Sequence, residues 1–211
     1  MDIANRIDHT MLKADSTTET IERYCEEAIK YHFASICVNT CHVPFVAKKL
    51  KGTGVNTCCV VGFPLGAMLP SAKAFEASEA VKEGANEVDM VINIGAIKDQ
   101  NWNYVKDDIQ KVVEASKPAI VKVIIETCLL TDSEKVKACE LAMEAGAAFV
   151  KTSTGFSTGG ATIDDVKLMK KVVGNQLKVK ASGGIRTPEF AQQLVEAGAD
   201  RIGAGDGKVL I

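Results

Sequence analysis

Phe149-Val150-Lys151-Thr152-Ser153-Thr154-Gly155-Phe156 is the stretch from which the fold can be worked out. The apolar run over residues 147–150 has no polar alternation, which is typical of a strand covered by helices on both faces of a parallel sheet. Lys151 then stands at the carboxyl end of this strand, where parallel α/β folds place their functional side chains. A lysine at a strand end can also simply extend into solvent, so its neighbours decide between the two interpretations.

Strand-like and helical segments alternate along the rest of the chain. The predicted strands cover residues 7–10, 33–39, 55–63, 87–92, 120–126, 147–151, 177–181 and 199–203. The predicted helices cover residues 17–31, 43–51, 71–83, 102–116, 131–144, 162–173 and 188–197. This alternation predicts a compact α/β fold, a (β/α)8 TIM barrel with a short or absent final helix. An open doubly wound sheet is the alternative.

The length and charge of the chain limit the classes of function that it can have. The 211 residues are enough to bury a sizeable core, and we expect one domain over residues 1–211. Lys and Arg number 25 against 27 Asp and Glu, a balance that argues against nucleic acid or an acidic membrane as a partner. No stretch has the apolar length of a signal peptide core or a membrane span, so a soluble, cytoplasmic protein is predicted.

The cysteines predict neither a disulfide nor a metal site. There are seven, an odd number, and several lie in apolar strand-like runs, which is typical of reduced thiols in a cytosol. Cys37-Val38-Asn39-Thr40-Cys41-His42 has the wrong spacing for haem attachment, and no second Cys/His pair follows at zinc spacing. We therefore expect no metal and no cofactor.

The polar residues at predicted strand ends are the candidates for chemistry, because the site of a (β/α)8 barrel lies on this face. They are Asp8, Asn39, Asp89, Asn93, Glu126, Lys151 and Lys180. Lys180 lies one strand after Lys151, on the same strand face as Lys178 but nearer the carboxyl end. If Lys180 approaches Lys151 in a small, partly desolvated space, repulsion and burial both favour a neutral amine, which is a nucleophile toward carbonyls.

Asp89 lies in an otherwise apolar strand. A lone buried carboxylate is unfavourable unless it is paired, so a lysine partner or a general acid/base role is indicated. The alternative is a salt bridge that only stabilises the barrel. For Asp8, Lys122 and Glu126, a satisfied polar layer inside the barrel is an equally simple interpretation.

Glycine-rich turns follow the last two predicted strands, at Ser182-Gly183-Gly184 and at Gly203-Ala204-Gly205-Asp206-Gly207. Many barrels of this type bind phosphate at this position, through backbone N–H groups and helix N-termini. Together with the small residues after Lys151, the turns predict a phosphate site. The substrate-binding candidates are Asp8, Thr152, Gly155, Gly183, Gly184, Gly203 and Gly205.

Six stretches, in order over nearly the whole chain, match motifs of a known family. They are Asp8-His9-Thr10, Gly62-Phe63-Pro64-Leu65-Gly66, the run from Glu87 to Gly95, the run from Val121 to Thr127, the Lys151 stretch, and Lys180-Ala181-Ser182-Gly183-Gly184-Ile185-Arg186. With these motifs the chain resembles the deoxyribose-phosphate aldolases.

The resemblance implies a class I aldolase, without metal or cofactor, that reversibly cleaves 2-deoxy-D-ribose 5-phosphate to D-glyceraldehyde 3-phosphate and acetaldehyde. It implies that Lys151 forms the Schiff base and that Lys180 favours the neutral amine of Lys151. Asp89 would be the acid/base that works with Lys180. The partners would be a small sugar phosphate and acetaldehyde, and the sequence leaves open whether the chain is a monomer or a homodimer.

The turn after the last strand departs from the family pattern, which usually has hydroxyl residues there. Asp206 would place negative charge beside a phosphate dianion. Either its side chain points away, so that the N–H groups of residues 205–207 still bind, or phosphate binding is weakened. The alternative functions are another lysine-dependent barrel aldolase and a barrel that binds a sugar phosphate without catalysis.

Overall fold

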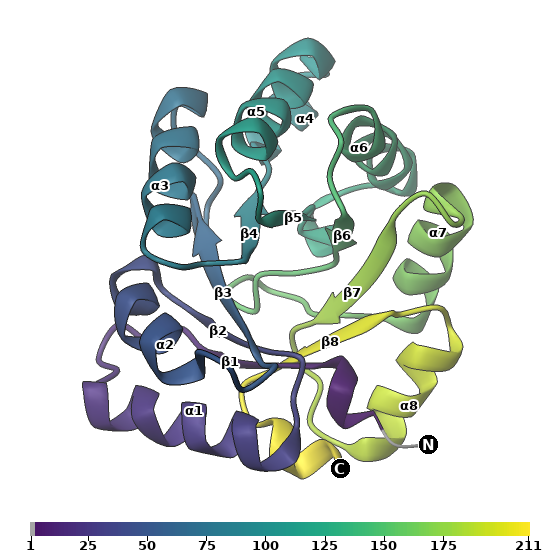
Figure 1. Cartoon of the computed structure of the whole chain (residues 1–211). Coiled ribbons are helices and arrows are strands. Elements are labelled where there is room, and N and C mark those ends of the chain that lie inside the picture. The colour runs from purple at the N-terminus through teal and green to yellow at the C-terminus, as the bar shows by residue number, and fades with distance from the viewer. Residues whose placement is uncertain (1–2) are drawn as a thin grey trace.

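Eight parallel strands close into a barrel in the computed structural model, which describes residues 3–211. Each strand pairs with the next along the chain, and the last pairs with the first (Figure 1). The strands are β1 (Ile7–Met11), β2 (Ser35–Val38), β3 (Asn56–Val61), β4 (Glu87–Val91), β5 (Ile120–Ile124), β6 (Phe149–Lys151), β7 (Lys178–Ser182) and β8 (Arg201–Ala204). The predicted (β/α)8 barrel is confirmed, and the open doubly wound sheet was the wrong alternative.

The helices surround the strands, as Figure 1 shows. They are α1 (Thr18–Tyr31), α2 (Val43–Leu50), α3 (Pro70–Lys82), α4 (Ile94–Lys98), α5 (Trp102–Ala115), α6 (Asp132–Glu144), α7 (Ile163–Val173) and α8 (Pro188–Glu196). Single 3-10 turns occur at η1 (Ala4–Arg6), η2 (Thr40–His42), η3 (Thr127–Leu129) and η4 (Gly207–Leu210). The short final helix expected from the sequence is the turn η4. Within residues 3–211, every helix is too short or too polar to cross a lipid bilayer.

Helix starts follow local side-chain chemistry. Thr131 caps α6, and its partner Glu134 completes a capping box, so two backbone N–H groups are satisfied. The five-residue helix α4 was not predicted, because it is too short to show a helical period. It begins where the Asn93 side chain accepts a hydrogen bond from Ala96 N at 3.0 Å.

Alternation along the strands separates two environments. Val123 and Val179 belong to the apolar layer between the strands and the helices. Lys122 and Lys180, one residue away on the same strands, point to the opposite face, into the barrel. The interior therefore holds charged side chains, whereas the main core lies outside the strands.

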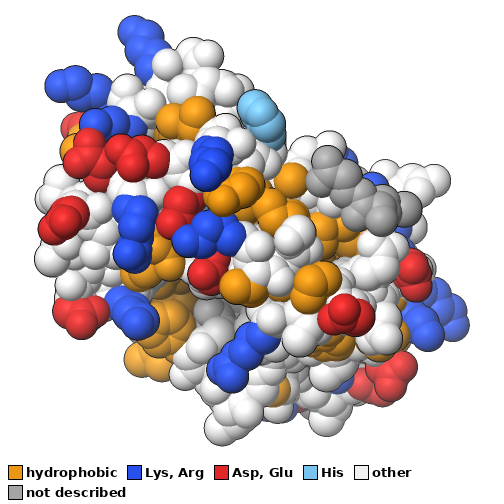
Figure 2. Space-filling model, turned by 90° about the horizontal axis from the view of Figure 1, so that it is seen from below, with side chains coloured by type: hydrophobic (Ala, Val, Ile, Leu, Met, Phe, Trp, Pro, Cys, Tyr) orange, Lys and Arg blue, Asp and Glu red, His pale blue; other side chains and the backbone are white. Residues whose placement is uncertain are grey.

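The surface carries mixed charge. On the face that Figure 2 shows, Lys and Arg side chains are interspersed with Asp and Glu, and apolar side chains lie between them. The ion pairs of the described residues include Lys208 and Glu27, with Nζ and Oε1 separated by 2.6 Å. This mixture agrees with the balanced composition.

Candidate active site

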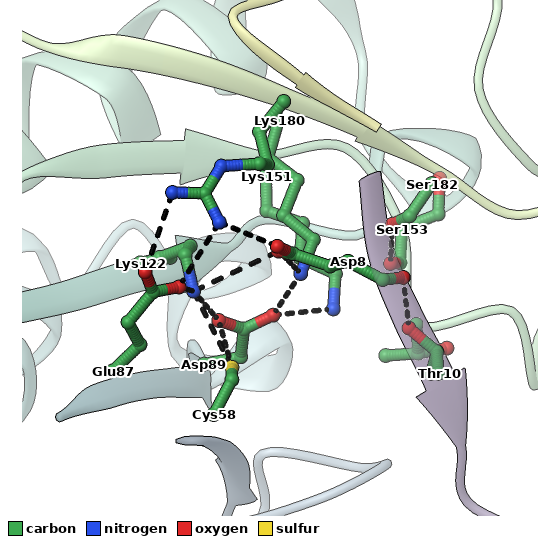
Figure 3. Close-up of polar contacts among 12 residues, drawn as sticks. Asp8, Thr10, Cys58, Glu87, Asp89, Lys122, Lys151, Ser153, Lys180 and Ser182 are labelled. Carbon is green, nitrogen blue, oxygen red and sulfur yellow. Dashed lines mark hydrogen bonds and ion pairs between the residues drawn. The ribbon is translucent and has the colours of Figure 1, made fainter. Parts of the chain in front are cut away.

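Asp89 lies at the centre of a buried ion network inside the barrel (Figure 3). Its Oδ2 accepts hydrogen bonds from Lys151 Nζ at 2.8 Å and from Lys180 Nζ at 2.7 Å. Its Oδ1 accepts from Lys122 Nζ at 2.7 Å and from Cys58 Sγ at 3.2 Å. Burial by itself raises the pKa of Asp89, but the charges of the three lysines outweigh burial and hold that pKa well below its usual range. Asp89 is therefore an ionised carboxylate that three lysines share.

The strand register brings these side chains together. Asp89 on β4 lies opposite Lys122 on β5, and Lys151 on β6 lies opposite Lys180 on β7. Register partners on neighbouring parallel strands carry their side chains on the same face of the sheet. Both pairs therefore project into the barrel, where their charged groups meet.

Lys180 is held as an ammonium group between two carboxylates. Its Nζ lies 2.5 Å from Asp8 Oδ2 and 2.7 Å from Asp89 Oδ2. Burial lowers the pKa of Lys180, but the charges of Asp8 and Asp89 more than compensate and raise it above its ordinary value. The approach of Lys180 to Lys151 follows the sequence prediction, and Asp89 has the lysine partner that was expected for it, because one of its oxygens binds both nitrogens.

A second layer of charges continues the network toward the strand starts. Arg201 Nη1 lies 2.5 Å from Asp8 Oδ1, and Lys122 Nζ lies 2.5 Å from Glu87 Oε2. The network thus contains four cationic side chains, Lys122, Lys151, Lys180 and Arg201, and three carboxylates, Asp8, Glu87 and Asp89. Arg201 was missed at the sequence level, although alternation along its strand could have placed it inside.

Lys151 connects this network to a cavity of about 510 Å³ at the mouth of the barrel. The cavity is lined by the carboxyl ends of β1, β6, β7 and β8 and the segments that follow them, together with a residue of α1. The lining residues are Thr10, Met11, Leu12, Lys13, Tyr24, Lys151, Thr154, Gly155, Phe156, Ser182, Gly183, Gly184, Ile185, Arg186, Gly203, Ala204 and Gly205. Among the described members of the ion network, Lys151 alone lines the cavity. A ligand in the cavity can therefore reach this amine directly.

The predicted glycines Gly155, Gly183, Gly184, Gly203 and Gly205 all line the cavity. Two lining cations, Lys13 and Arg186, were not predicted as site residues. Arg186 lies two residues after Gly184, a position that could have suggested it.

Asp8 and Thr152, predicted to bind substrate, lie outside the cavity wall. Asp8 is fully buried, and its carboxylate binds Lys180, Arg201 and the Ser35 hydroxyl. The Thr152 hydroxyl donates to the Ser182 carbonyl oxygen at 3.1 Å. The structure thus shows both side chains bound within the protein, and their contact with substrate stays a prediction. Strand spacing predicts which face a side chain occupies, but it does not predict which residues line the opening.

The loops after β6 and β7 are joined by backbone contacts. Ala161 N donates to Gly183 O at 3.0 Å, and the Ser182 hydroxyl donates to Ser153 O at 2.6 Å. A Cβ at Gly160 would lie 2.3 Å from Gly183 O, so only glycine permits this approach. The two loops therefore form one wall of the cavity.

Glu126, two residues after the end of β5, supports this wall. It adopts a left-handed conformation with a φ of 55°, and its buried carboxylate accepts hydrogen bonds from the backbone N–H and the hydroxyl of Thr154. Thr154 itself lines the cavity. Glu126 thus orients a residue of the wall without lining the cavity.

Asp206 points away from the cavity wall, which answers the question raised by the sequence. Its Oδ1 accepts from Lys208 N at 3.1 Å, and the side chain caps η4. The N–H of Gly207 is also engaged, because it donates to His9 Nδ1 at 3.1 Å. Of the three N–H groups considered for phosphate, that of Gly207 is therefore already used within the protein.

Asp89 belongs to a cluster of candidate metal ligands. The ligand atoms of Cys37, Cys58 and Asp89 lie within 4.8 Å of one another. Both oxygens of Asp89 already bind lysine nitrogens, so a cation there would meet the positive charge of the network. This donor set does not favour a metal.

Comparisons with known proteins agree with this geometry. A family model described as DeoC/LacD family aldolase matches residues 3–209. The deoxyribose-phosphate aldolase of Clostridium novyi is 58% identical, over 100% of this chain and 96% of the relative. That of Finegoldia magna is 57% identical, over 98% of this chain and 97% of the relative.

Solved structures agree as well. The tetrameric deoxyribose phosphate aldolase from Aeropyrum pernix superposes with a TM-score of 0.92 at 32% identity, covering 99% of this chain and 88% of the other. The match extends over the whole barrel, including the segments that carry Lys151 and the glycine turns. On this evidence, the chain belongs to the DeoC/LacD aldolase family.

Proposed function

We propose that this chain is a class I aldolase that reversibly cleaves 2-deoxy-D-ribose 5-phosphate to D-glyceraldehyde 3-phosphate and acetaldehyde, with Lys151 as the amine that forms the Schiff base. The observation that carries the proposal is the position of Lys151, which links the buried ion network to the cavity. The names of the full-length relatives support the choice of substrate.

In the cleavage direction, neutral Lys151 Nζ adds to the C1 carbonyl of the open-chain sugar, and loss of water gives a protonated imine. Removal of the proton on the 3-hydroxyl allows the C2–C3 bond to break, and its electrons move to the imine nitrogen. Glyceraldehyde 3-phosphate leaves, and an enamine remains on Lys151. Protonation of the enamine carbon and hydrolysis release acetaldehyde and regenerate the amine.

Asp89 is placed to manage protons at the amine. It binds Lys151 Nζ directly, so it can accept a proton before attack and return one during imine formation and hydrolysis. Lys180 binds the same oxygen and helps to keep Asp89 ionised. In the proposed mechanism Lys151 is the nucleophile, Asp89 the acid/base and Lys180 its charged partner.

The phosphate group is proposed to lie at the far end of the cavity from Lys151. Gly183 and Gly184 after β7 and Gly205 after β8 supply backbone there. Arg186 and Lys13 add two positive charges at the same cavity, and Arg186 can bind a phosphate through two parallel hydrogen bonds. The cavity volume is within the range usual for small-molecule sites.

The proposal is tested by borohydride reduction in the presence of acetaldehyde, followed by peptide mass spectrometry. An ethyl group is expected on Lys151 and nowhere else. Lys151→Leu should abolish the adduct and lower deoxyribose 5-phosphate cleavage by roughly 10⁴-fold or more, because the imine cannot form. Lys178→Leu removes an exposed lysine of the next strand and should behave like wild type.

An adduct on Lys180 would overturn the assignment of the nucleophile. Imine formation without acetaldehyde release from deoxyribose 5-phosphate would indicate another lysine-dependent aldolase. Binding of the sugar phosphate without any adduct would indicate a non-catalytic barrel.

We also propose that the enzyme is cytoplasmic, that it acts in deoxynucleoside breakdown and that it forms a homodimer. Large apolar side chains that are well exposed, among them Leu65, Leu69 and Phe75, provide surface on which copies of the chain could associate. Light scattering of the purified protein distinguishes a dimer from a monomer and from the tetramer described for the Aeropyrum pernix enzyme.

A further inference from the structure

A second buried polar cluster lies outside the ion network, between β1, α1 and η4. We name it the His9 cluster; it consists of His9, Tyr24, Glu27, Gly207 and Lys208. His9 is the residue after Asp8 on β1 and points to the opposite face of the strand, away from the ion network, where it is fully buried. The proposed mechanism uses none of these side chains.

Both ring nitrogens of His9 have partners. Nδ1 accepts the backbone N–H of Gly207 at 3.1 Å, and Nε2 lies 2.8 Å from Glu27 Oε2. Since an N–H donor faces Nδ1, the ring proton lies on Nε2 and is donated to Glu27. The other oxygen of Glu27 accepts from Lys208 Nζ at 2.6 Å. The carboxylate thus fixes the tautomer in which Nδ1 is an acceptor.

The His9 cluster contacts the wall of the cavity. Tyr24 stacks on the His9 ring with a centroid distance of 4.1 Å, and its hydroxyl donates to Gly205 O at 2.6 Å. Tyr24 and Gly205 both line the cavity. The turn after β8 is therefore attached to the cluster at two points, Gly205 through Tyr24 and Gly207 through His9.

We propose that His9 is a positioning residue for the phosphate end of the substrate site: its unprotonated Nδ1 holds residues 203–207 in the conformation that forms this part of the cavity wall. The inference rests on the proposed function, which places the substrate phosphate at this turn. His9 does not itself contact the substrate. It acts through the backbone of residues 203–207, which is proposed to contact the phosphate.

Protonation of His9 would remove this acceptor, because an Nδ1–H would then face the N–H of Gly207. The charged and titratable groups around the ring are Glu27 and Tyr24 from α1, Asp206 from the turn and Lys208 from η4, with Arg23 beyond Tyr24. Burial lowers the pKa of His9 more than Glu27 and Asp206 raise it. The ring is therefore neutral at pH 7, and acidification should weaken phosphate binding.

Three variants of His9 distinguish the effect of losing the Nδ1 hydrogen-bond acceptor from the effect of losing the shape of the ring. His9→Leu fills the space without an acceptor. His9→Asn can place its amide oxygen near the position of Nδ1, whereas His9→Gln reaches toward the position of Nε2. We expect His9→Leu and His9→Gln to raise the KM for deoxyribose 5-phosphate by roughly 3- to 10-fold, the equivalent of one hydrogen bond, and His9→Asn to restore it.

The measurements compare KM and kcat for deoxyribose 5-phosphate with those for 2-deoxyribose, which has no phosphate. The variants should leave kcat/KM for 2-deoxyribose unchanged. On acidification below pH 6.5, the KM for deoxyribose 5-phosphate should rise more steeply in wild type than in His9→Asn, since the substrate phosphate titrates with both proteins but only wild type carries the imidazole. Equal KM values in all forms, or equal losses with both sugars, would overturn the inference.

A binding assay separates this inference from the proposed function. Calorimetry with inorganic phosphate needs no turnover, and it should show weaker binding to His9→Leu and His9→Gln than to wild type and His9→Asn. If wild type fails to cleave deoxyribose 5-phosphate, the proposed function is wrong, but the order of phosphate affinities still decides the role of His9. If His9→Leu does not fold, the comparison of His9→Asn with His9→Gln decides it.

Discussion

At the scale of single residues, Asp89 supplies the negative charge around which the interior is arranged. Three lysine nitrogens and one thiol bind its two oxygens, and no part of its side chain is exposed. Burying lysines is expensive unless a counter-charge is close. Asp89 therefore has two roles, one in the stability of the barrel and one in the proposed proton transfers at Lys151.

Replacing Asp89 with Asn should affect both the stability of the barrel and the rate of cleavage. The neutral amide leaves buried lysines without their shared counter-charge, so we expect the free energy of unfolding to fall by about 3–5 kcal/mol. The kcat for cleavage should fall by roughly 10²- to 10⁴-fold, because the acid/base is lost. Asp107→Asn is the matched control, since this exposed aspartate pairs with Lys111 on the surface of α5 and should change stability by less than about 1 kcal/mol. Urea unfolding and steady-state kinetics measure the two effects, and a fully stable Asp89→Asn protein would contradict this account.

The meeting of Lys151, Lys180 and Asp89 could be predicted from the sequence, because strand ends and two-residue spacing determine which side chains face the interior. Asp8 could not be assigned in the same way. Whether an inward side chain lines the opening or lies below it depends on strand stagger around the barrel, which the sequence does not encode locally. For Lys13 and Arg186, a long side chain leaves a loop, and its direction depends on the loop conformation.

At the scale of elements, the joined loops after β6 and β7 form the wall between Lys151 and the proposed phosphate end. The contact depends on the absence of a side chain at Gly160, which packs against the backbone of Gly183. This arrangement keeps Gly155 and Gly183 at fixed positions along the cavity.

Gly160→Ala should separate these loops. The added methyl group would lie 2.3 Å from Gly183 O, so the backbone must move. We expect a loss of stability of about 1–3 kcal/mol and a raised KM for deoxyribose 5-phosphate. Gly95→Ala is the control, because its methyl group would lie 3.5 Å from the nearest atom, an ordinary contact, within helix α4. A wild-type KM in Gly160→Ala would show that the loops adapt without cost to binding.

The strands were predictable because they are continuous apolar runs, and the long helices because their apolar period extends over several turns. Helix α4 was not, since five residues show no period and depend on the Asn93 cap. The contact between the two loops was not predictable either, because it joins backbone atoms more than twenty positions apart.

At the scale of the whole molecule, the buried charges determine how stability depends on pH. Burial raises the pKa values of Asp8 and Asp89, but the surrounding cationic side chains outweigh burial and lower them from 3.8, so the stability from these carboxylates is present above that pH and is lost below it. The pKa values of Lys122 and Lys180 are raised from 10.5, so their contribution is present below pH 10.5 and is lost as the pH rises further. For His9 the pKa is lowered from 6.5, so the unfolded chain binds this proton more readily and acidification below pH 6.5 favours unfolding.

Urea unfolding across the pH range should therefore show a plateau from pH 6.5 to about 9, above which the thiols of buried cysteines such as Cys25, Cys59 and Cys139 ionise more readily in the unfolded chain. It should also show a shallow decline below pH 6.5 and a steep decline below about pH 4. The shallow decline belongs to His9 and should be absent in His9→Asn. A protein that becomes more stable on acidification from pH 6.5 to 5 would contradict the assignment. The barrel itself could be predicted from the sequence, whereas this profile could not, because it depends on which charges lie close together.

The one-sided cavity has a consequence for stereochemistry. The space beside Lys151 opens toward the segments after β1, β6, β7 and β8, whereas Asp89 on β4 and its partner Lys122 on β5 occupy the interior. In the synthetic direction the enamine carbon becomes a CH2 group, so the new stereocentre is the former aldehyde carbon. Because the aldehyde enters from one side and its phosphate is proposed to bind at the far end of the cavity, one face of its carbonyl group is expected to meet the enamine, and each new carbon–carbon bond is expected to form with a single handedness.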